Sequence, residues 1–234
     1  MQNPNIIIPT YSVIVLIYHR TPELVQMAKN CVASIRNNSQ DYELIIVDNG
    51  SPERFSWENE CDTYIRFNQN RGISAGWNAG LKASRGRYKV ILGDDTIMHE
   101  GYLEALRKAI EMPNAGVANV HVQHLPHGEG IVENYKWFSG ACFMLKQKTL
   151  EKVGYFDEGI FPCNTEDWDY WLRTYQAGLK LYVNYEYSVQ HLEGQTVHAK
   201  DLSEHTQVLL RKLEEKYNVN PTAIFCGEAK MPFS

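Results

Sequence analysis

Residues 88–96 read YKVILGDDT, and this stretch is the starting point for predicting the fold. An apolar run that follows Gly86 and ends at Gly93 and two aspartates is typical of a buried strand that stops abruptly. Neighbouring carboxylates repel each other unless a cation compensates them, so Asp94 and Asp95 indicate a site for a divalent ion. Mg²⁺ or Mn²⁺ suits such oxygen ligands and would also bind substrate phosphates. A surface turn whose acids cap the next helix is the alternative interpretation.

The residues before this stretch alternate between apolar runs and amphipathic segments. Apolar runs predict strands at 11–17, 43–47 and 63–67, and the spacing of apolar residues predicts a helix to about residue 38 that begins at residue 22. A second helix is expected at 74–84 despite Gly76 and Gly80. This alternation predicts an α/β fold with a doubly wound, mostly parallel sheet and helices on both faces. Ligands of such sheets bind beyond the carboxyl ends of the strands, so three strand ends should converge on one crevice. Those ends are Tyr18-His19-Arg20, Asp48-Asn49 and Asp94-Asp95.

The second half of the chain continues with shorter and less regular segments. Thr165 is expected to cap a helix whose first turn carries Glu166, Asp167 and Asp169, because acids interact favourably with the helix dipole there. The tail after Pro221 is expected to be loosely structured. The other expected elements are helices at 100–111, 148–153 and 201–217 and strands at 116–122, 137–145 and 179–183.

Length and composition narrow the class of protein. The 234 residues fit one α/β domain, 1–200, with a C-terminal helix and tail, 201–234, packed on it or extending it. A net charge of −5 argues against electrostatic capture of nucleic acid. The sequence has no apolar run of membrane-spanning length, and its five cysteines are scattered without a C-x-x-C pair. These features predict a cytoplasmic protein, either free or peripheral at a membrane.

The usual phosphate-binding loops are missing from the sequence. The turn after the first strand reads YHRTP where a dinucleotide fold needs G-x-G-x-x-G, so phosphates must be neutralised in another way. A metal ion held by Asp95 would do this. His121, His124 and His127 recur at intervals of three, but Pro126 interrupts helical spacing, so a polar loop is favoured over a metal cluster.

Four stretches occur together in a fixed order: YSVIVLIYHR, ELIIVDNGS, NRGISAGWNAGLKASRGRYKVILGDDT, and VGYFDEGIFPCNTEDWDYWLR followed by His191. As a set, which covers about residues 11–195, they resemble the family 2 glycosyltransferases of the GT-A fold. The resemblance is greatest to the branch that includes rhamnosyltransferase-like enzymes. It implies metal-dependent transfer of a sugar, with inversion, from a nucleoside-diphosphate donor to an acceptor hydroxyl.

The resemblance also implies roles for individual residues. Asp48 matches the position that hydrogen-bonds the nucleotide base, and Tyr18 and Arg71 match positions near the base and the phosphates. GDDT matches the D-x-D motif of the family, with Asp95 as the metal-binding acid. In the later stretch, Asp167 matches the catalytic base. His191 matches a position that often completes the metal shell.

One position departs from the family pattern. Gly93 stands where the first acid of the D-x-D motif is usual, which puts the usual ribose contact in doubt. Asp94 or Asn70 would have to supply that contact. The remaining candidates are Glu166 to orient the base or the acceptor, Arg20 for the donor, and Trp137 and Trp168 for the acceptor.

The identity of the substrates is less visible than the reaction. Asp48 can accept the ring N–H of uracil or thymine, so UDP- and dTDP-sugars are the expected donors. A glycan, a lipid-linked saccharide, a protein and a modified nucleobase all stay open as acceptors, and a homodimer is a further expectation. Two alternatives are a nucleotidyltransferase, which normally has a Gly-rich loop after its first strand, and a non-catalytic nucleotide-sugar binder, which Gly93 would favour.

Overall fold

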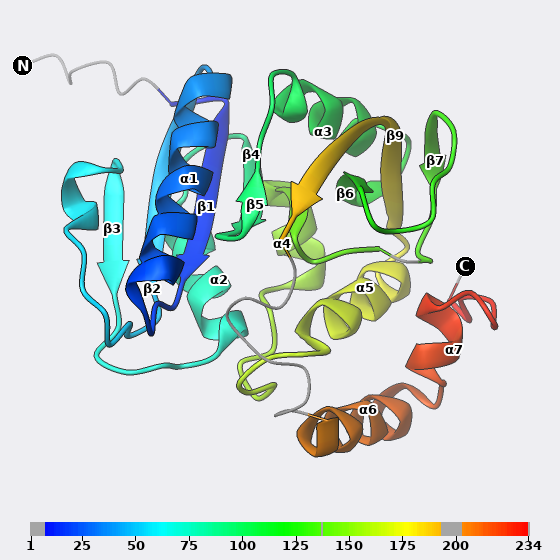
Figure 1. Cartoon of the computed structure of the whole chain (residues 1–234). Helices are drawn as coiled ribbons and strands as arrows, with labels where there is room; N and C mark the ends of the chain where they lie inside the picture. Colours follow the sequence, from blue (N-terminus) through cyan, green and yellow to red (C-terminus); the bar gives the residue numbers. More distant parts are fainter. Residues whose placement is uncertain (1–7, 137, 193–202, 234) are drawn as a thin grey trace, which may run out of the picture.

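The chain forms a mixed sheet with helices on both faces (Figure 1). The computed structural model describes residues 8–136, 138–192 and 203–233. In these residues the sheet has nine strands in the order β3-β2-β1-β4-β8-β6-β9-β5, with β7 beside β9. The strands are β1 (Tyr11–Ile17), β2 (Tyr42–Asp48), β3 (Thr63–Arg66), β4 (Tyr88–Gly93), β5 (Thr96–Ile97), β6 (Ala115–Val122), β7 (Ile131–Glu133), β8 (Cys142–Lys146) and β9 (Lys180–His191).

Strand directions explain why one edge of the sheet collects the polar strand ends. β1, β2, β3 and β4 are parallel, and β8 runs antiparallel to both β4 and β6. β9 is parallel to β6 and antiparallel to β5 and β7. The carboxyl ends of β1, β2 and β4 therefore lie at the same edge, as the predicted parallel arrangement requires.

Two apolar clusters hold the helices on the sheet. Successive residues of a strand point to opposite faces, so Val13 and Val15 belong to one cluster and Ile14 to the other. The first cluster includes side chains from α1 and α3, and the second includes side chains from the other helices. The helices are α1 (Pro22–Asn38), α2 (Ile73–Ala83), α3 (Tyr102–Ile110), α4 (Gln147–Val153), α5 (Glu166–Gln176), α6 (Ser203–Tyr217) and α7 (Pro221–Phe225).

Several local predictions need correction. The strand predicted at 137–145 begins only at Cys142, and the strand predicted at 179–183 continues to His191. Thr165 occupies the N-cap position of α5 with φ +91°, but its side chain makes no capping hydrogen bond. Trp137, a predicted acceptor residue, lies outside the described residues.

The prediction of a loosely structured tail after Pro221 was wrong. Asn220 accepts a hydrogen bond from the Ala223 N–H at 2.9 Å and so caps α7, with Pro221 in the first turn. Ile224 and Phe225 are buried in the second apolar cluster. The tail is ordered by contacts with residues distant in sequence, which a local pattern does not reveal.

The C-terminal segment packs on the same body as the rest of the chain (Figure 1). The Lys216 ammonium and the Tyr217 hydroxyl donate to the Asp169 carboxylate of α5, at 2.7 Å and 2.6 Å. The rings of Trp168 and Phe225 are 5.1 Å apart. The proposed boundary at residue 200 stays a prediction. In the described part of the chain, no helix combines the length and the apolar character that crossing a membrane requires.

Candidate active site

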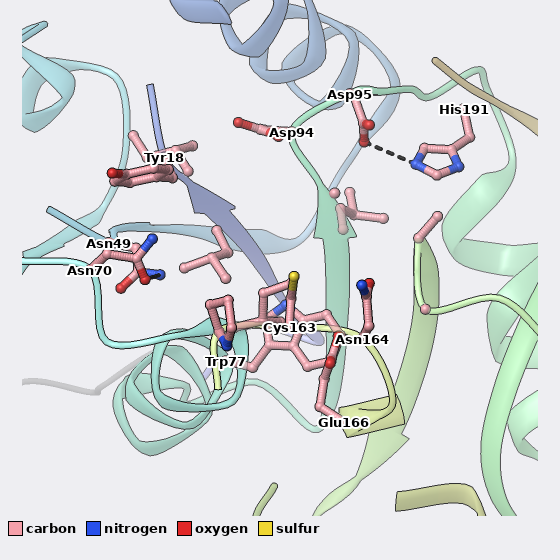
Figure 2. Close-up of a pocket in the computed structure, with 18 residues that line it drawn as sticks. Tyr18, Asn49, Asn70, Trp77, Asp94, Asp95, Cys163, Asn164, Glu166 and His191 are labelled. Carbon is pink, nitrogen blue, oxygen red and sulfur yellow. Dashed lines mark hydrogen bonds and ion pairs between the residues drawn. The ribbon is translucent and has the colours of Figure 1, made fainter. Parts of the chain in front are cut away.

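The carboxyl ends of β1, β2 and β4 open onto a pocket of about 340 Å³ (Figure 2). Leu16 and Leu92 belong to its apolar lining, and polar side chains from several segments surround them. Six of the predicted site residues line this pocket: Tyr18, Asn70, Asp94, Asp95, Glu166 and His191. The structure thus brings together residues that are up to 173 positions apart, as the convergence of strand ends predicts.

Backbone pairing places Asp95 beside His191. β5 pairs with the end of β9, with Thr96 opposite His191, and the Leu192 N–H donates to the Asp95 carbonyl oxygen at 2.9 Å. The Asp95 Oδ1 and His191 Nε2 atoms are consequently 3.1 Å apart (Figure 2). Among the described residues, no group of three or more His, Cys, Asp or Glu side chains is placed to hold a metal ion.

The two adjacent acids have different partners. Asp94 Oδ2 lies 3.2 Å from the Nε2 atom of His19, and both side chains are buried. Burial raises the pKa of Asp94, and the hydrogen bond to His19 opposes that rise. Figure 2 shows the carboxylates of Asp94 and Asp95 pointing in different directions. The pair is therefore two separate groups and not one shared acid site.

Gly93 leaves space for the observed position of the Asp95 carboxylate. A Cβ atom on residue 93 would lie 2.7 Å from Asp95 Oδ1, closer than real Cβ contacts. The departure from the D-x-D pattern therefore gives the Asp95 carboxylate room beside the strand end.

Asp48 is not among the residues that line the pocket. Its carboxylate accepts hydrogen bonds from the Ser51 N–H at 2.7 Å and the Tyr64 hydroxyl at 2.9 Å, and it pairs with Arg66. The side chain is buried, so these contacts hold the turn after β2. A role for Asp48 in base recognition stays a prediction.

The two predicted arginines also lie outside the pocket lining. Arg20 is exposed in the loop after β1. The Arg71 guanidinium lies 3.4 Å from the Glu158 carboxylate and 4.8 Å from the centre of the Phe67 ring. Because about half of the Arg71 side chain is exposed, its pair with Glu158 adds little stability, and the guanidinium can be redirected toward a bound anion.

Two acids at the start of α5 stand next to the pocket. Glu166 is buried, and its Oε2 atom has no hydrogen-bond partner in the described part of the chain. Asp167 accepts from the Trp168 N–H at 2.8 Å, and its Oδ2 atom would be 3.0 Å from a Cβ on Gly140. Burial raises the pKa of both acids, and the neighbouring Asp167 charge raises that of Glu166 further. The helix dipole, which favours ionised Asp167, is thus opposed by burial.

Residues 12–171 match the family model described as glycosyl transferase family 2. The chain belongs to this family. Among its relatives, glycosyltransferase GlyG of Streptococcus pneumoniae serotype 4 is 25% identical over 152 residues, which are 61% of this chain and 48% of GlyG. Glycosyltransferase AglE of Haloferax volcanii is 26% identical over 173 residues, 66% of this chain and 57% of AglE. The chain therefore spans about half the length of these relatives.

Two solved structures share the fold of this family 2 chain. Staphylococcus aureus TarS, residues 1–349, superposes with a TM-score of 0.64 at 14% identity over 88% of this chain and 65% of TarS. GalNAc-T7, solved with UDP, GalNAc and Mn²⁺, gives 0.64 at 15% identity over 97% of this chain and 57% of GalNAc-T7. The predicted GT-A fold and the predicted glycosyltransferase family are confirmed. The rhamnosyltransferase-like branch stays a prediction.

A second hollow of about 330 Å³ adjoins the pocket of this family 2 chain. Asn164 and Glu166 line both spaces. Asp167 and Trp168 line only the second one, together with Thr206 and Leu210 of α6. The two acids of α5 therefore stand where the two spaces meet.

Four polar or aromatic residues of the pocket were not among the predicted site residues: Asn49, Trp77, Cys163 and Asn164. Asn49 follows Asp48 at a strand end, so its position was a usable signal. Its amide donates to Asn70 Oδ1 at 3.1 Å and accepts from the Arg71 N–H at 2.8 Å, which links two loops of the site. Cys163 and Asn164 carried no such signal, because a loop far along the chain brings them in. Burial raises the pKa of Cys163 to about 12, so its thiol stays protonated at neutral pH.

Proposed function

We propose that the chain is an inverting, metal-dependent glycosyltransferase that moves a sugar from a UDP- or dTDP-sugar to an acceptor hydroxyl. One observation carries the proposal: a carboxylate–imidazole pair faces the pocket from one side, and of the pair of acids at the start of α5, Glu166 faces it from another side while Asp167 lines the adjoining hollow. Asp95 and His191 form the first pair, and Figure 2 shows Glu166 across the pocket from them. A donor between them would have its diphosphate near the first pair and its sugar near the second.

The Asp95–His191 pair fits a divalent ion. Neighbouring ligands of an octahedral ion, each about 2.1 Å from it, lie about 3.0 Å apart. The Asp95 Oδ1 to His191 Nε2 distance is 3.1 Å, and the carboxylate is a ligand of the kind that suits Mn²⁺ and Mg²⁺. Mn²⁺ or Mg²⁺ would supply neutralisation of the charge that develops on the nucleoside diphosphate. Donor phosphates and water would supply further ligands beside this pair.

Tyr18, Asn49 and Asn70 are assigned to the donor by their place around the pocket. Tyr18 lines the pocket with an aromatic ring, on which a base or ribose can pack (Figure 2). Asn49 and Asn70 offer amide groups on the same side (Figure 2). Arg71 would leave Glu158 to reach the phosphates. Arg20, Asp48 and Asp94 stay in the proposed donor set, with Asp48 favouring uracil or thymine.

Asp167 is the proposed general base. In a single displacement, the acceptor oxygen forms a bond to the anomeric carbon while the bond to the diphosphate oxygen breaks, and inversion follows. Asp167 takes the proton of the acceptor hydroxyl, and the diphosphate leaves with the bonding electron pair. Glu166, whose pKa is raised more strongly by burial and by Asp167, would stay protonated and donate a hydrogen bond to the sugar or acceptor.

The acceptor is proposed to enter through the second hollow, where Trp168 lies beside Asp167. A glycan, a lipid-linked saccharide, a protein and a modified base are the acceptor classes under this proposal. The proposal also includes four further points: membership of the rhamnosyltransferase-like branch, a division at residue 200, a homodimer, and a cytoplasmic or membrane-peripheral location.

The position of Gly93 no longer favours a non-catalytic binder. Because a larger residue would press on Asp95, glycine at this position is compatible with a working metal ligand. The family match also favours a glycosyltransferase over a nucleotidyltransferase.

A thermal-shift screen tests the function directly. UDP, dTDP, GDP and CDP are added with and without Mn²⁺, and UDP or dTDP with Mn²⁺ should raise the melting temperature by about 5 °C or more at saturation. Either component alone should have a smaller effect. If no nucleotide together with metal stabilises the fold, the transferase proposal is wrong.

A further inference from the structure

Helix α6 contributes to the second hollow although it lies beyond residue 171, where the family match ends. We propose that the first half of α6 is a wall of the acceptor site, and that Thr206 and Leu210 on this wall select a saccharide acceptor. This inference rests on the proposed function, because it takes the second hollow as the place where the acceptor binds.

One stripe of α6 serves two purposes. Thr206, Leu210, Leu213 and Tyr217 follow one another at helical spacings of four, three and four, so they share a face. Leu213 and Tyr217 are buried in the second apolar cluster. Thr206 and Leu210 are only half-buried and line the hollow. The inward face of α6 thus continues past its packing partners and meets open space beside Asp167.

The wall is fixed in place relative to the acids of α5. Asn164 Nδ2 donates to Thr206 Oγ1 at 3.0 Å, so the first turns of α6 are attached to the loop that precedes α5. At its other end, Lys216 and Tyr217 donate to Asp169, whose side chain is fully buried. Hydrogen bonds to a charged group are among the stronger ones, so this end should move little. The distance from the wall to Asp167 is therefore set by α5 itself.

The chemistry of the lining favours a saccharide. Leu210 and the indole of Trp168 present apolar surface that suits the C–H face of a sugar ring. Thr206 accepts from Asn164, so its hydroxyl proton is still available to donate to a sugar hydroxyl. Asp167 adds acceptor oxygens, and its negative charge would repel a phosphodiester backbone. This mixture of apolar surface and hydroxyl-binding groups fits a sugar better than a polyprenyl chain or a nucleic acid.

The test measures saccharide binding apart from sugar transfer. Methyl glycosides of glucose, galactose, mannose and N-acetylglucosamine are titrated onto the whole chain with UDP and Mg²⁺, and binding is followed by saturation-transfer NMR. At least one glycoside should bind, and Thr206→Val and Leu210→Asp should each weaken it by about tenfold or more. Val208→Ala is the matched control, because Val208 is an exposed residue of the same helix and does not line the hollow.

The controls separate this inference from the proposed function. Stabilisation by UDP and metal should be the same in all variants, which shows that the fold and donor pocket are intact. Thr206→Ser, which keeps the hydroxyl, should bind the glycoside as the wild type does. The inference is overturned if no glycoside binds, or if Thr206→Val and Leu210→Asp bind it as well as Val208→Ala. The saccharide assignment would be overturned if no glycoside binds in this assay but a peptide, a polyprenyl phosphate or an oligonucleotide does. Failure of UDP and metal to stabilise the wild type would count against the proposed function instead.

Discussion

Replacing Gly93 by alanine should weaken metal binding without weakening the fold. The backbone of Gly93 is outside the left-handed region, so it accepts alanine without strain. The new Cβ would be 2.7 Å from Asp95 Oδ1, and ordinary contact begins at 3.4 Å, so the carboxylate must move by about 0.7 Å. Metal–ligand distances tolerate about 0.2 Å. The shift should therefore cost about tenfold or more in metal affinity, the range found when groups that orient a ligand are lost.

The assay is a titration of Mn²⁺ in saturating UDP, with free Mn²⁺ measured by electron paramagnetic resonance. The melting temperature without metal should be unchanged or slightly higher, because alanine restricts the unfolded chain. Asp95→Asn should lose affinity more severely than Gly93→Ala. Asp94→Asn removes the same charge from the neighbouring residue, which faces His19, so it should lose less Mn²⁺ affinity than Asp95→Asn does. Wild-type affinity in Gly93→Ala would refute the reasoning that Asp95 binds the ion from its observed position.

Three further predictions concern α5 and its contact with α6. Asp167→Asn should lower the transfer rate by about 10²–10⁴-fold while UDP and Mn²⁺ still stabilise the fold, and a wild-type rate would rule out this base. Because the folded-state pKa of Glu166 is raised, the native state binds its proton more tightly, and stability falls as the pH rises toward that raised value. Glu166→Gln should therefore melt at a higher temperature than the wild type at about pH 9, and this difference in melting temperature should be smaller at about pH 5. A larger difference at about pH 5 than at about pH 9 would show that the pKa of Glu166 is not raised in the folded state. Tyr217→Phe removes a hydrogen bond to the buried Asp169 carboxylate and should lower the free energy of unfolding in urea by about 1.5–3 kcal/mol, whereas a change below about 0.5 kcal/mol would show that the bond is unimportant.

The donor side of the site was predictable because its signals are local. Each of Tyr18, Asp94 and Asp95 follows directly after an apolar run that could only be a buried strand. Parallel strands bring their carboxyl ends to one edge of the sheet. The residues that directly follow these strands therefore lie close together, independent of the conformation of the loops. The helices α1 and α2 were also predicted from local sequence, and the apolar stripe of α1 indicated its buried face as well.

The acceptor side was less predictable because it depends on contacts between distant segments. Nothing near Thr206 in the sequence indicates that its side chain meets Asn164. Likewise, Asp169 looked like one more acid in the first turn of a helix, yet it is fully buried with Arg173, Lys216 and Tyr217 around it. The burial that raises the pKa of Asp167 also comes from such packing. The sequence shows only that Asp167 lies at a helix N-terminus, where the dipole favours the ionised carboxylate, and does not show this burial.

The reason for expecting a metal ion has changed as a result. From the sequence alone, the adjacent carboxylates of Asp94 and Asp95 indicate a compensating cation. In the fold, the Asp94 and Asp95 carboxylates each face an imidazole, from His19 and His191, and point in different directions. His19 opposes this repulsion, although the Asp95 charge still contributes to the raised pKa of Asp94, so the repulsion by itself does not identify an ion. The proposal of a metal ion therefore depends on the 3.1 Å distance between Asp95 and His191 and on the pocket that they line. Gly93→Ala should alter that distance without removing a charge. It is for this reason a sharper test than the removal of either acid.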